Sequence, residues 1–498
     1  MRESALSTAF ERLPLMPLVA LGGTAVVAVL LGPESLTMAL IAGAGMMVIA
    51  LRPQWGVAMI LILLMVQYGT RQTSREGVAG IAALVPGGEG LLTINNILGL
   101  FLALLLAYQI FRDNDWSFLH NRQLQLIALI TLALAFAGFV SGIDTADAVN
   151  LGLRATSGQD PTRLLVSRAL FLVLFVFFLR APRDLRMIVA IFVVLTVTTA
   201  WSGSEASFTF GGRSEVADYR AGGVDVLIGS TQNPNRLAMI CTLALIFIWE
   251  YSQAHSLRRW WWATGSVALL LVMTVFLSAS RGGVLGLGFA CLLLFVRRDS
   301  GAGRIVYSIA IAALGIVLIS QVVPEQALER ISNIPGISAN AEEGEGGGSI
   351  ERRGYTYGIG LQIWKTAPII GIGPGNWPYV RFITDPARSP AAPHSSFLEA
   401  LVEGGLLTLS LYLILFAVTV RDLLRCERSP AAMAAATRDD LAWLVTATRI
   451  AVVTFLVFSL FGDLWDLIFS YFLLGVAGVI IDRYRPLALT PASAPLPA

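Results

Sequence analysis

Long apolar segments recur from one end of the sequence to the other, and they constrain the fold more than any other feature. Many run for roughly 15 to 21 residues, which is the length that an α-helix needs to cross the hydrocarbon of a bilayer. The chain is 56% hydrophobic and only 14% charged, too little charge to cover a soluble protein of 498 residues. The sequence therefore predicts an integral membrane protein.

The fold class that these segments predict is all-α: a polytopic membrane helix bundle of about 14 transmembrane helices. The count falls to about 12 if the shortest apolar segments do not span the bilayer. The predicted helices cover residues 13–32, 36–51, 54–69, 94–111, 123–141, 164–180, 184–202, 236–250, 261–279, 282–296, 304–323, 396–420, 441–461 and 464–481.

Arginines in the connecting loops predict the orientation of the bundle. With the N-terminus in the cytoplasm, every loop on that side is short and rich in arginine, as the positive-inside rule requires. Both termini are then cytoplasmic. We predict a transmembrane bundle over residues 1–482 and a disordered cytoplasmic tail over residues 483–498, which is rich in proline and alanine.

The predicted outer loops are longer and hold more glycine and proline. The largest is a periplasmic loop over residues 324–395, which precedes the third-last helix. Its glycine-rich stretch Gly344–Ser349 predicts a flexible hinge or a disordered segment. The apolar residues of 357–364 predict a short helix that lies on the membrane surface.

Metal and cofactor sites are not predicted. Cys241, Cys291 and Cys426 lie in or beside apolar helices, and no His, Cys or Asp cluster has metal-ligand spacing. The triplet Asp113–Asp115 resembles the acidic triplet of nucleotide-sugar transferases, but it stands in a short cytoplasmic loop. A solvated turn is the simpler interpretation, and His120 and His255 are likewise interpreted as solvated loop residues.

Basic residues at the outer starts of predicted helices are the strongest functional signal. Arg168, Arg236 and Arg281 stand where the helix dipole is positive and a cation is mildly unfavourable. If these helix starts converge, dipoles and guanidinium groups point at one place, which would bind an oxygen-rich anion such as a diphosphate. The alternative is that each arginine reaches out to the lipid headgroups.

His394 is the candidate catalytic base. It precedes the helix predicted at 396–420, with Glu399 and Glu403 one turn apart on that helix. A neutral imidazole beside a carboxylate is suited to take a proton from a hydroxyl, and Glu399 is the second catalytic candidate. A structural or solvated histidine is the alternative.

Three motifs in this order resemble the O-antigen ligase / O-antigen polymerase superfamily of bacterial membrane glycosyltransferases. They are Asn233–Ala238 (NPNRLA), Ser278–Gly283 (SASRGG), and the pair of stretches 368–375 and 394–405. The resemblance covers about residues 220–420. It implies a GT-C-like fold in the inner membrane and transfer of a glycan from undecaprenyl diphosphate to an acceptor hydroxyl at the periplasmic face, without a metal.

The resemblance also implies roles for individual residues. Arg236 and Arg281 match the diphosphate-binding arginines of the family, and His394 matches its catalytic histidine. Arg353 matches the arginine of the large loop, although Arg352 is an alternative; Arg168 is a further candidate for the diphosphate site. Ser395 is a departure, because the family often has asparagine after the histidine.

Three functions stay open at this point. A polymerase of O-antigen or exopolysaccharide, which would join one lipid-linked glycan to another and act with a chain-length regulator, is slightly favoured by the length of the chain. An O-antigen ligase of lipopolysaccharide biosynthesis would transfer the glycan to the lipid A core instead. A lipid or polysaccharide transporter is the alternative of another class, but no repeat of the kind common in transporters is visible.

Overall fold

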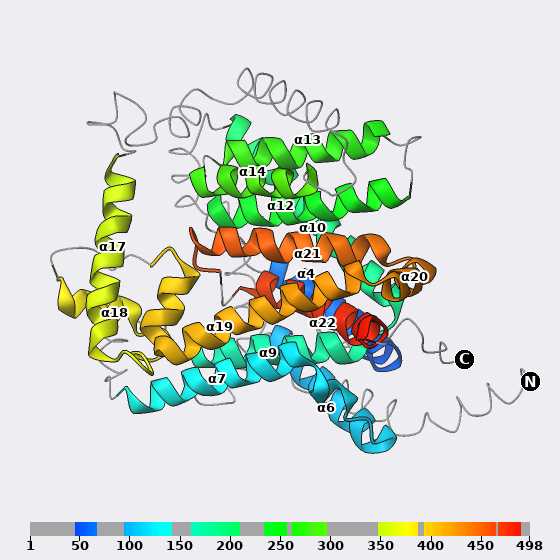
Figure 1. The fold of residues 1–498 in the computed structure, drawn as a ribbon, viewed down its shortest axis with the longest axis horizontal. Coiled ribbons are helices and arrows are strands. Elements are labelled where there is room, and N and C mark those ends of the chain that lie inside the picture. The colour runs from blue at the N-terminus through cyan, green and yellow to red at the C-terminus, as the bar shows by residue number, and fades with distance from the viewer. Residues whose placement is uncertain are drawn as a thin grey trace, which may run out of the picture.

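The computed structural model describes residues 45–66, 94–141, 161–209, 234–255, 261–278, 280–295, 347–386, 393–464 and 467–489. These residues form helices and their connections, without a β-strand. The predicted all-α class is thus confirmed over the described part of the chain. Figure 1 shows most of the helices running along one direction, with α17 and α18 across one end.

The helices lie close to their predicted positions. The predicted helices 13–32 and 304–323 fall outside the described residues, as does much of 36–51. The others correspond to α4 (Pro53–Val66), α6 (Ile94–Asp113), α7 (Arg122–Val140), α9 (Pro161–Phe178), α10 (Pro182–Thr209), α12 (Pro234–Ala254), α13 (Trp261–Leu277), α14 (Arg281–Phe295), α19 (Ser396–Arg428), α21 (Ala442–Ser459) and α22 (Ile468–Leu489).

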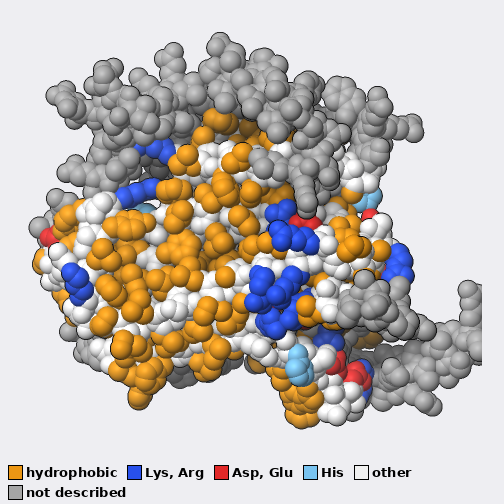
Figure 2. Space-filling model, in the orientation of Figure 1, with side chains coloured by type: hydrophobic (Ala, Val, Ile, Leu, Met, Phe, Trp, Pro, Cys, Tyr) orange, Lys and Arg blue, Asp and Glu red, His pale blue; other side chains and the backbone are white. Residues whose placement is uncertain are grey.

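Length and apolar composition identify five of the described helices as able to cross a membrane: those that include 122–140, 182–201, 235–254, 396–428 and 442–459. Four shorter apolar helices, within α4, α9, α13 and α14, accompany them. Side chains such as Phe139 and Leu132 on α7 are exposed, and Figure 2 shows hydrophobic side chains over most of one face. A protein surface of this kind faces lipid. The chain is a helical membrane protein.

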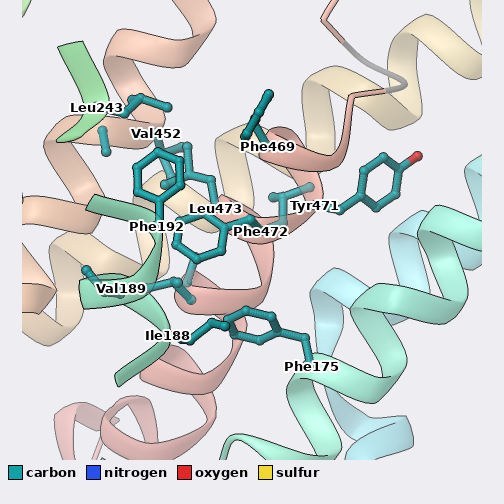
Figure 3. Packing of buried hydrophobic residues seen from close by; sticks show 14 of the residues in the cluster. Phe175, Ile188, Val189, Phe192, Leu243, Val452, Phe469, Tyr471, Phe472 and Leu473 are labelled. Carbon is teal, nitrogen blue, oxygen red and sulfur yellow. The ribbon is translucent and has the colours of Figure 1, made fainter. Parts of the chain in front are cut away.

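The centre of the bundle is packed by aromatic side chains. Phe192 of α10 stacks on Phe472 of α22 with ring centroids 4.6 Å apart, and Phe175 of α9 meets the same ring edge-to-face at 5.9 Å. Figure 3 shows these rings among Ile188, Val189 and other aliphatic side chains. Interlocked rings of this kind hold the helices in one arrangement, which places the helix ends that form the site.

Several boundaries differ from the sequence predictions. The predicted short helix is the 20-residue α17 (Gly347–Thr366), which includes three residues of the predicted hinge, Gly347–Ser349. α22 continues to Leu489, so residues 483–489 are helical rather than disordered. α19 extends beyond residue 420 to Arg428, because its later turns pack on neighbouring helices. Three elements were not predicted: α18 (Trp377–Thr384), the 3₁₀ turn η4 (Ser117–His120) and α20 (Pro430–Arg438).

α19 is broken at Gly405, where a loop over residues 368–375 replaces the helical hydrogen bonds. Gly405 has φ +66°, which interrupts the helix one turn after Leu401. The two N–H groups and the two carbonyls left open there all pair with the loop. These four bonds are Ile372 N to Val402 O (3.0 Å), Gly373 N to Glu403 O (2.9 Å), Leu406 N to Pro368 O (2.9 Å) and Leu407 N to Ile369 O (3.1 Å).

This exchange of hydrogen bonds depends on a glycine at 405. A Cβ there would lie 2.2 Å from the carbonyl oxygen of Ile369, a backbone atom that cannot move aside, and the positive φ adds its own strain. We expect Gly405→Ala to lower stability by about 2–5 kcal/mol, measured by thermal unfolding of the purified protein in detergent. Gly358→Ala on α17 is the matched control, because nothing lies within 4 Å of its Cβ position. Equal stability of the two variants would contradict this account of the break.

Candidate active site

A short turn between α21 and α22 is the centre of the candidate site. α21 ends at Ser459, and the segment Leu460–Leu464 (the hub loop) leads towards α22. The starts of α12, α14 and α19 and the middle of α17 all contact this loop. Helices whose starts share one loop bring their positive dipole ends to the same side of the bundle.

α12 contacts the hub loop through its first two polar side chains. Asn235 Nδ2 donates to the carbonyl oxygen of Phe461 at 2.9 Å, and Arg236 Nη2 donates to the carbonyl oxygen of Asp463 at 3.1 Å. The Nε of Arg236 is buried and has no hydrogen-bond partner among the described residues. A buried, unsatisfied guanidinium N–H favours a bound acceptor at this position.

α14 begins directly beside the start of α12. Ser280 Oγ donates to Asn235 Oδ1 and accepts a hydrogen bond from Gly283 N at 2.8 Å. A Cβ at Gly282 would lie 2.9 Å from Cβ of Phe461, so the first turn of α14 is pressed against the hub loop. Arg281 stands between these two contacts as the first residue of α14. The structure therefore brings the starts that carry Arg236 and Arg281 together.

The start of α19 is joined to the hub loop by reciprocal hydrogen bonds. Ser395 N donates to Asp463 Oδ1 at 3.1 Å, and Ser396 N and Oγ donate to the carbonyl oxygen of Gly462 at 3.1 and 2.8 Å. Leu464 N donates to Ser396 Oγ at 2.9 Å. Ser395 also caps α19 by accepting a hydrogen bond from Leu398 N. The serine that departs from the family pattern thus has a local structural role.

His394 is held at the mouth of this junction. Its Nδ1 lies 3.5 Å from Asp463 Oδ2; the histidine side chain is 39% exposed and the aspartate side chain 12%. The backbone of His394 has φ +54°, a left-handed conformation that is costly for a residue with a Cβ. The hydrogen bonds of Ser395 and Ser396 hold it there. A strained residue fixed by its neighbours is typical of functional sites.

α17 places Arg353 near the same loop. Tyr357 OH donates to the carbonyl oxygen of Leu460 at 3.3 Å, and α17 packs against α19. Arg353 precedes Tyr357 by one helical turn and therefore lies on the same face of α17. The side chain of Arg352 is outside the described residues.

The other predicted site residues lie in different surroundings. Arg168 is buried in α9, which is not among the helices joined at the hub loop. Glu399 is half-buried one turn into α19. Its catalytic role stays a prediction. Glu403 is buried, and its Oε1 accepts a hydrogen bond from Trp377 N at 3.4 Å. It therefore secures the loop that crosses the break in α19.

The comparison with known families identifies part of the chain. Residues 265–413 match the family model described as O-Antigen ligase. This match supports the resemblance of the chain to the O-antigen ligase / polymerase superfamily over that segment. No curated protein matches the chain. The O-antigen ligase segment includes Arg281, Arg353, His394 and Glu399, whereas Arg236 on α12 lies outside it.

Asp463 is the site residue that the sequence analysis missed. It lies outside the O-antigen ligase segment, 69 positions after His394, in a five-residue turn whose other members are apolar or glycine. In the sequence, the only signal was that Asp463 and Asp466 are acidic residues in the short connection between two apolar helices. Within the described residues, no group of three or more His, Cys, Asp or Glu side chains is placed to hold a metal ion.

The opposite end of the bundle holds the two histidines that were interpreted as solvated. His120 is exposed, and Asp115 accepts from Ser117 N in the turn that follows, as predicted for the acidic triplet. The interpretation of His255 is wrong: its Nε2 lies 2.8 Å from Asp440 Oδ1, and its ring stacks on Tyr251 with centroids 4.0 Å apart. The sequence analysis did not predict that α20 and the turn at Asp440 lie beside His255.

Proposed function

We propose that this chain transfers a glycan from undecaprenyl diphosphate to an acceptor hydroxyl at the hub loop. One observation carries the proposal: the His394–Asp463 pair and the helix starts of Arg236 and Arg281 contact the same five-residue turn. A base and an anion site at one place are the two parts that a metal-independent displacement at a phosphorylated anomeric carbon needs.

The arginines would bind the diphosphate of the donor. The starts of α12 and α14 add positive dipole ends to the two guanidinium groups, and Arg236 has an Nε–H available. Arg353 faces the same loop from α17 and would reach an outer phosphate oxygen. As the bond between the anomeric carbon and the diphosphate oxygen breaks, its electron pair remains on the diphosphate, and these cations stabilise the growing charge.

His394 would activate the acceptor. Its Nδ1 is the ring nitrogen nearer to Asp463, so a proton on Nδ1 can be held by the carboxylate and leaves Nε2 as the base. Nε2 takes the proton of the acceptor hydroxyl while the hydroxyl oxygen forms the new bond to the anomeric carbon. The products are the extended glycan, undecaprenyl diphosphate and a proton on His394.

The acceptor defines two candidate activities. We propose polymerisation of lipid-linked glycans, because the number of predicted helices and the length of the chain favour a polymerase. Ligation to the lipid A core is the second candidate, because the matching family model carries the description O-Antigen ligase. The same chemistry at the hub loop would serve both reactions.

We infer that the hub loop faces the periplasm and that both termini are cytoplasmic in the inner membrane. Arginines gather at the other end of the bundle, near the start of α7, the end of α19 and the end of α22. The positive-inside rule assigns that end to the cytoplasm. Lipid-linked donors would then be used on the periplasmic side.

Oriented membrane vesicles test the activity and its side together. A short-chain diphosphate-linked glycan that cannot cross the membrane is supplied outside right-side-out or inverted vesicles containing the full chain. We expect transfer, with release of polyprenyl diphosphate, in right-side-out vesicles only, and no loss on adding a chelator. A lipid A core acceptor or a second donor, added separately, distinguishes ligase from polymerase. Transfer in inverted vesicles alone would contradict the orientation, and none in either would contradict the function.

A further inference from the structure

Four arginines surround one buried aspartate at the end of the bundle opposite the hub loop. Asp422 of α19 has a fully buried side chain, and its carboxylate oxygens lie 3.1 Å from Arg421 Nε, 3.4 Å from Arg425 Nη1, 3.4 Å from Arg122 Nη1 and 3.3 Å from Arg485 Nε. The arginines come from α7, α19 and α22. We call these five residues the arginine cluster.

The charges in the arginine cluster do not balance. One carboxylate faces four guanidinium groups, which leaves a surplus of three positive charges. Asp482 of α22 also lies within electrostatic reach of Arg485, and counting it still leaves a surplus of two. The negative end of the α19 dipole contributes only about half a charge. Neighbouring pairs at this end are matched one to one, as Arg483 with Asp439 and Arg180 with Asp115 show.

The surplus cations also have unused hydrogen-bond donors. The side chains of Arg122, Arg421 and Arg425 are each 41–46% exposed while one nitrogen of each meets Asp422. The Nε of Arg485 is buried and lies 3.3 Å from Asp422 Oδ2 without the geometry of a hydrogen bond. A guanidinium has five N–H donors in a planar fork, which suits the oxygens of a phosphate.

The position of the cluster indicates a lipid rather than a soluble anion. Leu413 and Ile414 are exposed on α19 two turns before Arg421, and Leu129 is exposed on α7 two turns after Arg122. Such side chains face the hydrocarbon, so the arginines lie at the headgroup level beside it. Figure 2 shows a compact group of basic side chains towards the α20 end of the molecule, bordered by hydrophobic ones.

We propose that the arginine cluster binds the headgroup of an anionic phospholipid in the leaflet opposite the active site. The surplus charge suits a headgroup with two phosphodiesters, so cardiolipin binds more tightly than phosphatidylglycerol, and zwitterionic phosphatidylethanolamine binds weakest. Asp422 neutralises part of the charge of the four guanidinium groups from inside, and the lipid phosphates supply the missing negative charge from outside. This site is independent of the proposed glycosyl transfer.

Lipid titration of the purified full chain in detergent, followed by native mass spectrometry, tests the proposal. The double variant with Arg421→Gln and Arg425→Gln should weaken cardiolipin binding about 30-fold. This value combines the usual contribution of two arginines at a membrane surface with the tenfold change in affinity that about 1.4 kcal/mol produces. Arg421→Gln alone should weaken it about fivefold if the double variant does not fold. Arg183→Gln is the control, because Arg183 is 76% exposed and pairs only with its neighbour Asp184.

Asp422→Asn distinguishes lipid binding from the alternative that the arginines only pair with Asp422 inside the protein. Removing the internal counter-charge raises the surplus, so cardiolipin binding should be retained or become tighter. Loss of binding in Asp422→Asn, or equal binding by the double variant and the wild type, would overturn the proposal. So would equal affinity for cardiolipin and phosphatidylethanolamine, or displacement of the lipid by millimolar inorganic phosphate, which would indicate a site for free anions.

Discussion

Replacing His394 with alanine should slow glycan transfer about 10²–10⁴-fold, the usual contribution of a positioned general base. The donor should still bind, because Arg236 and the first turn of α14, which begins at Arg281, contact the hub loop from other helices. The measurement is the rate of polyprenyl diphosphate release by the purified protein at saturating donor, together with the KM for the donor. His120→Ala is the matched control: that histidine is exposed at the opposite end of the bundle, and its loss should change neither quantity.

The pH dependence distinguishes a base from a cation at His394. Because only the neutral imidazole accepts a proton, the rate should fall as the pH is lowered from about 8.5 to about 5.5. Asp463→Asn should lower kcat with little change in the KM for the donor, since the amide cannot stabilise the imidazolium. A rate that rises towards low pH would mean that His394 serves as a cation for the diphosphate, and full activity of His394→Ala would exclude both roles.

The membrane helices could be predicted because their signal is local. The bounds of α7, α9 and α13 follow from runs of apolar residues whose length the bilayer fixes. α20 could not be predicted this way, since it is a short alanine-rich helix stabilised by packing against α22. The break in α19 was hidden for a related reason: Gly404-Gly405 lies in a hydrophobic run, and only the loop at 368–375 supplies its alternative hydrogen bonds.

Part of the candidate site could be predicted because its sequence signals are local as well. Arg236 and Arg281 stand out in the sequence because a cation at a helix start opposes the dipole, and each signal lies within a few residues. Asp463 has no such local signal. Its relation to His394 exists only because α21 returns the chain to the start of α19. Glu399 and Glu403, which adjoin His394 in sequence, were therefore the acids that sequence reasoning could find.

Alanine at Arg236 or at Arg281 should each reduce transfer about 10²–10³-fold, the usual effect of removing one donor that stabilises charge in the transition state. The two residues lie at the starts of helices that meet through Asn235 and Ser280, so in the proposed mechanism both cations would act on one diphosphate. Their loss should also weaken donor binding, unlike the loss of His394. The measurements are kcat and KM for the lipid-linked donor, with protein amount and thermal midpoint checked for each variant.

Lysine substitutions show whether geometry or charge alone matters at these two positions. Arg236→Lys retains the positive charge but loses the planar fork, which in arginine can pair with two phosphate oxygens while Nη2 donates to the carbonyl oxygen of Asp463. We therefore expect little recovery of activity from Arg236→Lys or Arg281→Lys. Arg183→Ala, on α10 at the other end of the bundle, should keep full activity. Near-normal transfer by either alanine variant would mean that its arginine only anchors the helix start at the membrane surface, and the diphosphate would then need other donors around the hub loop.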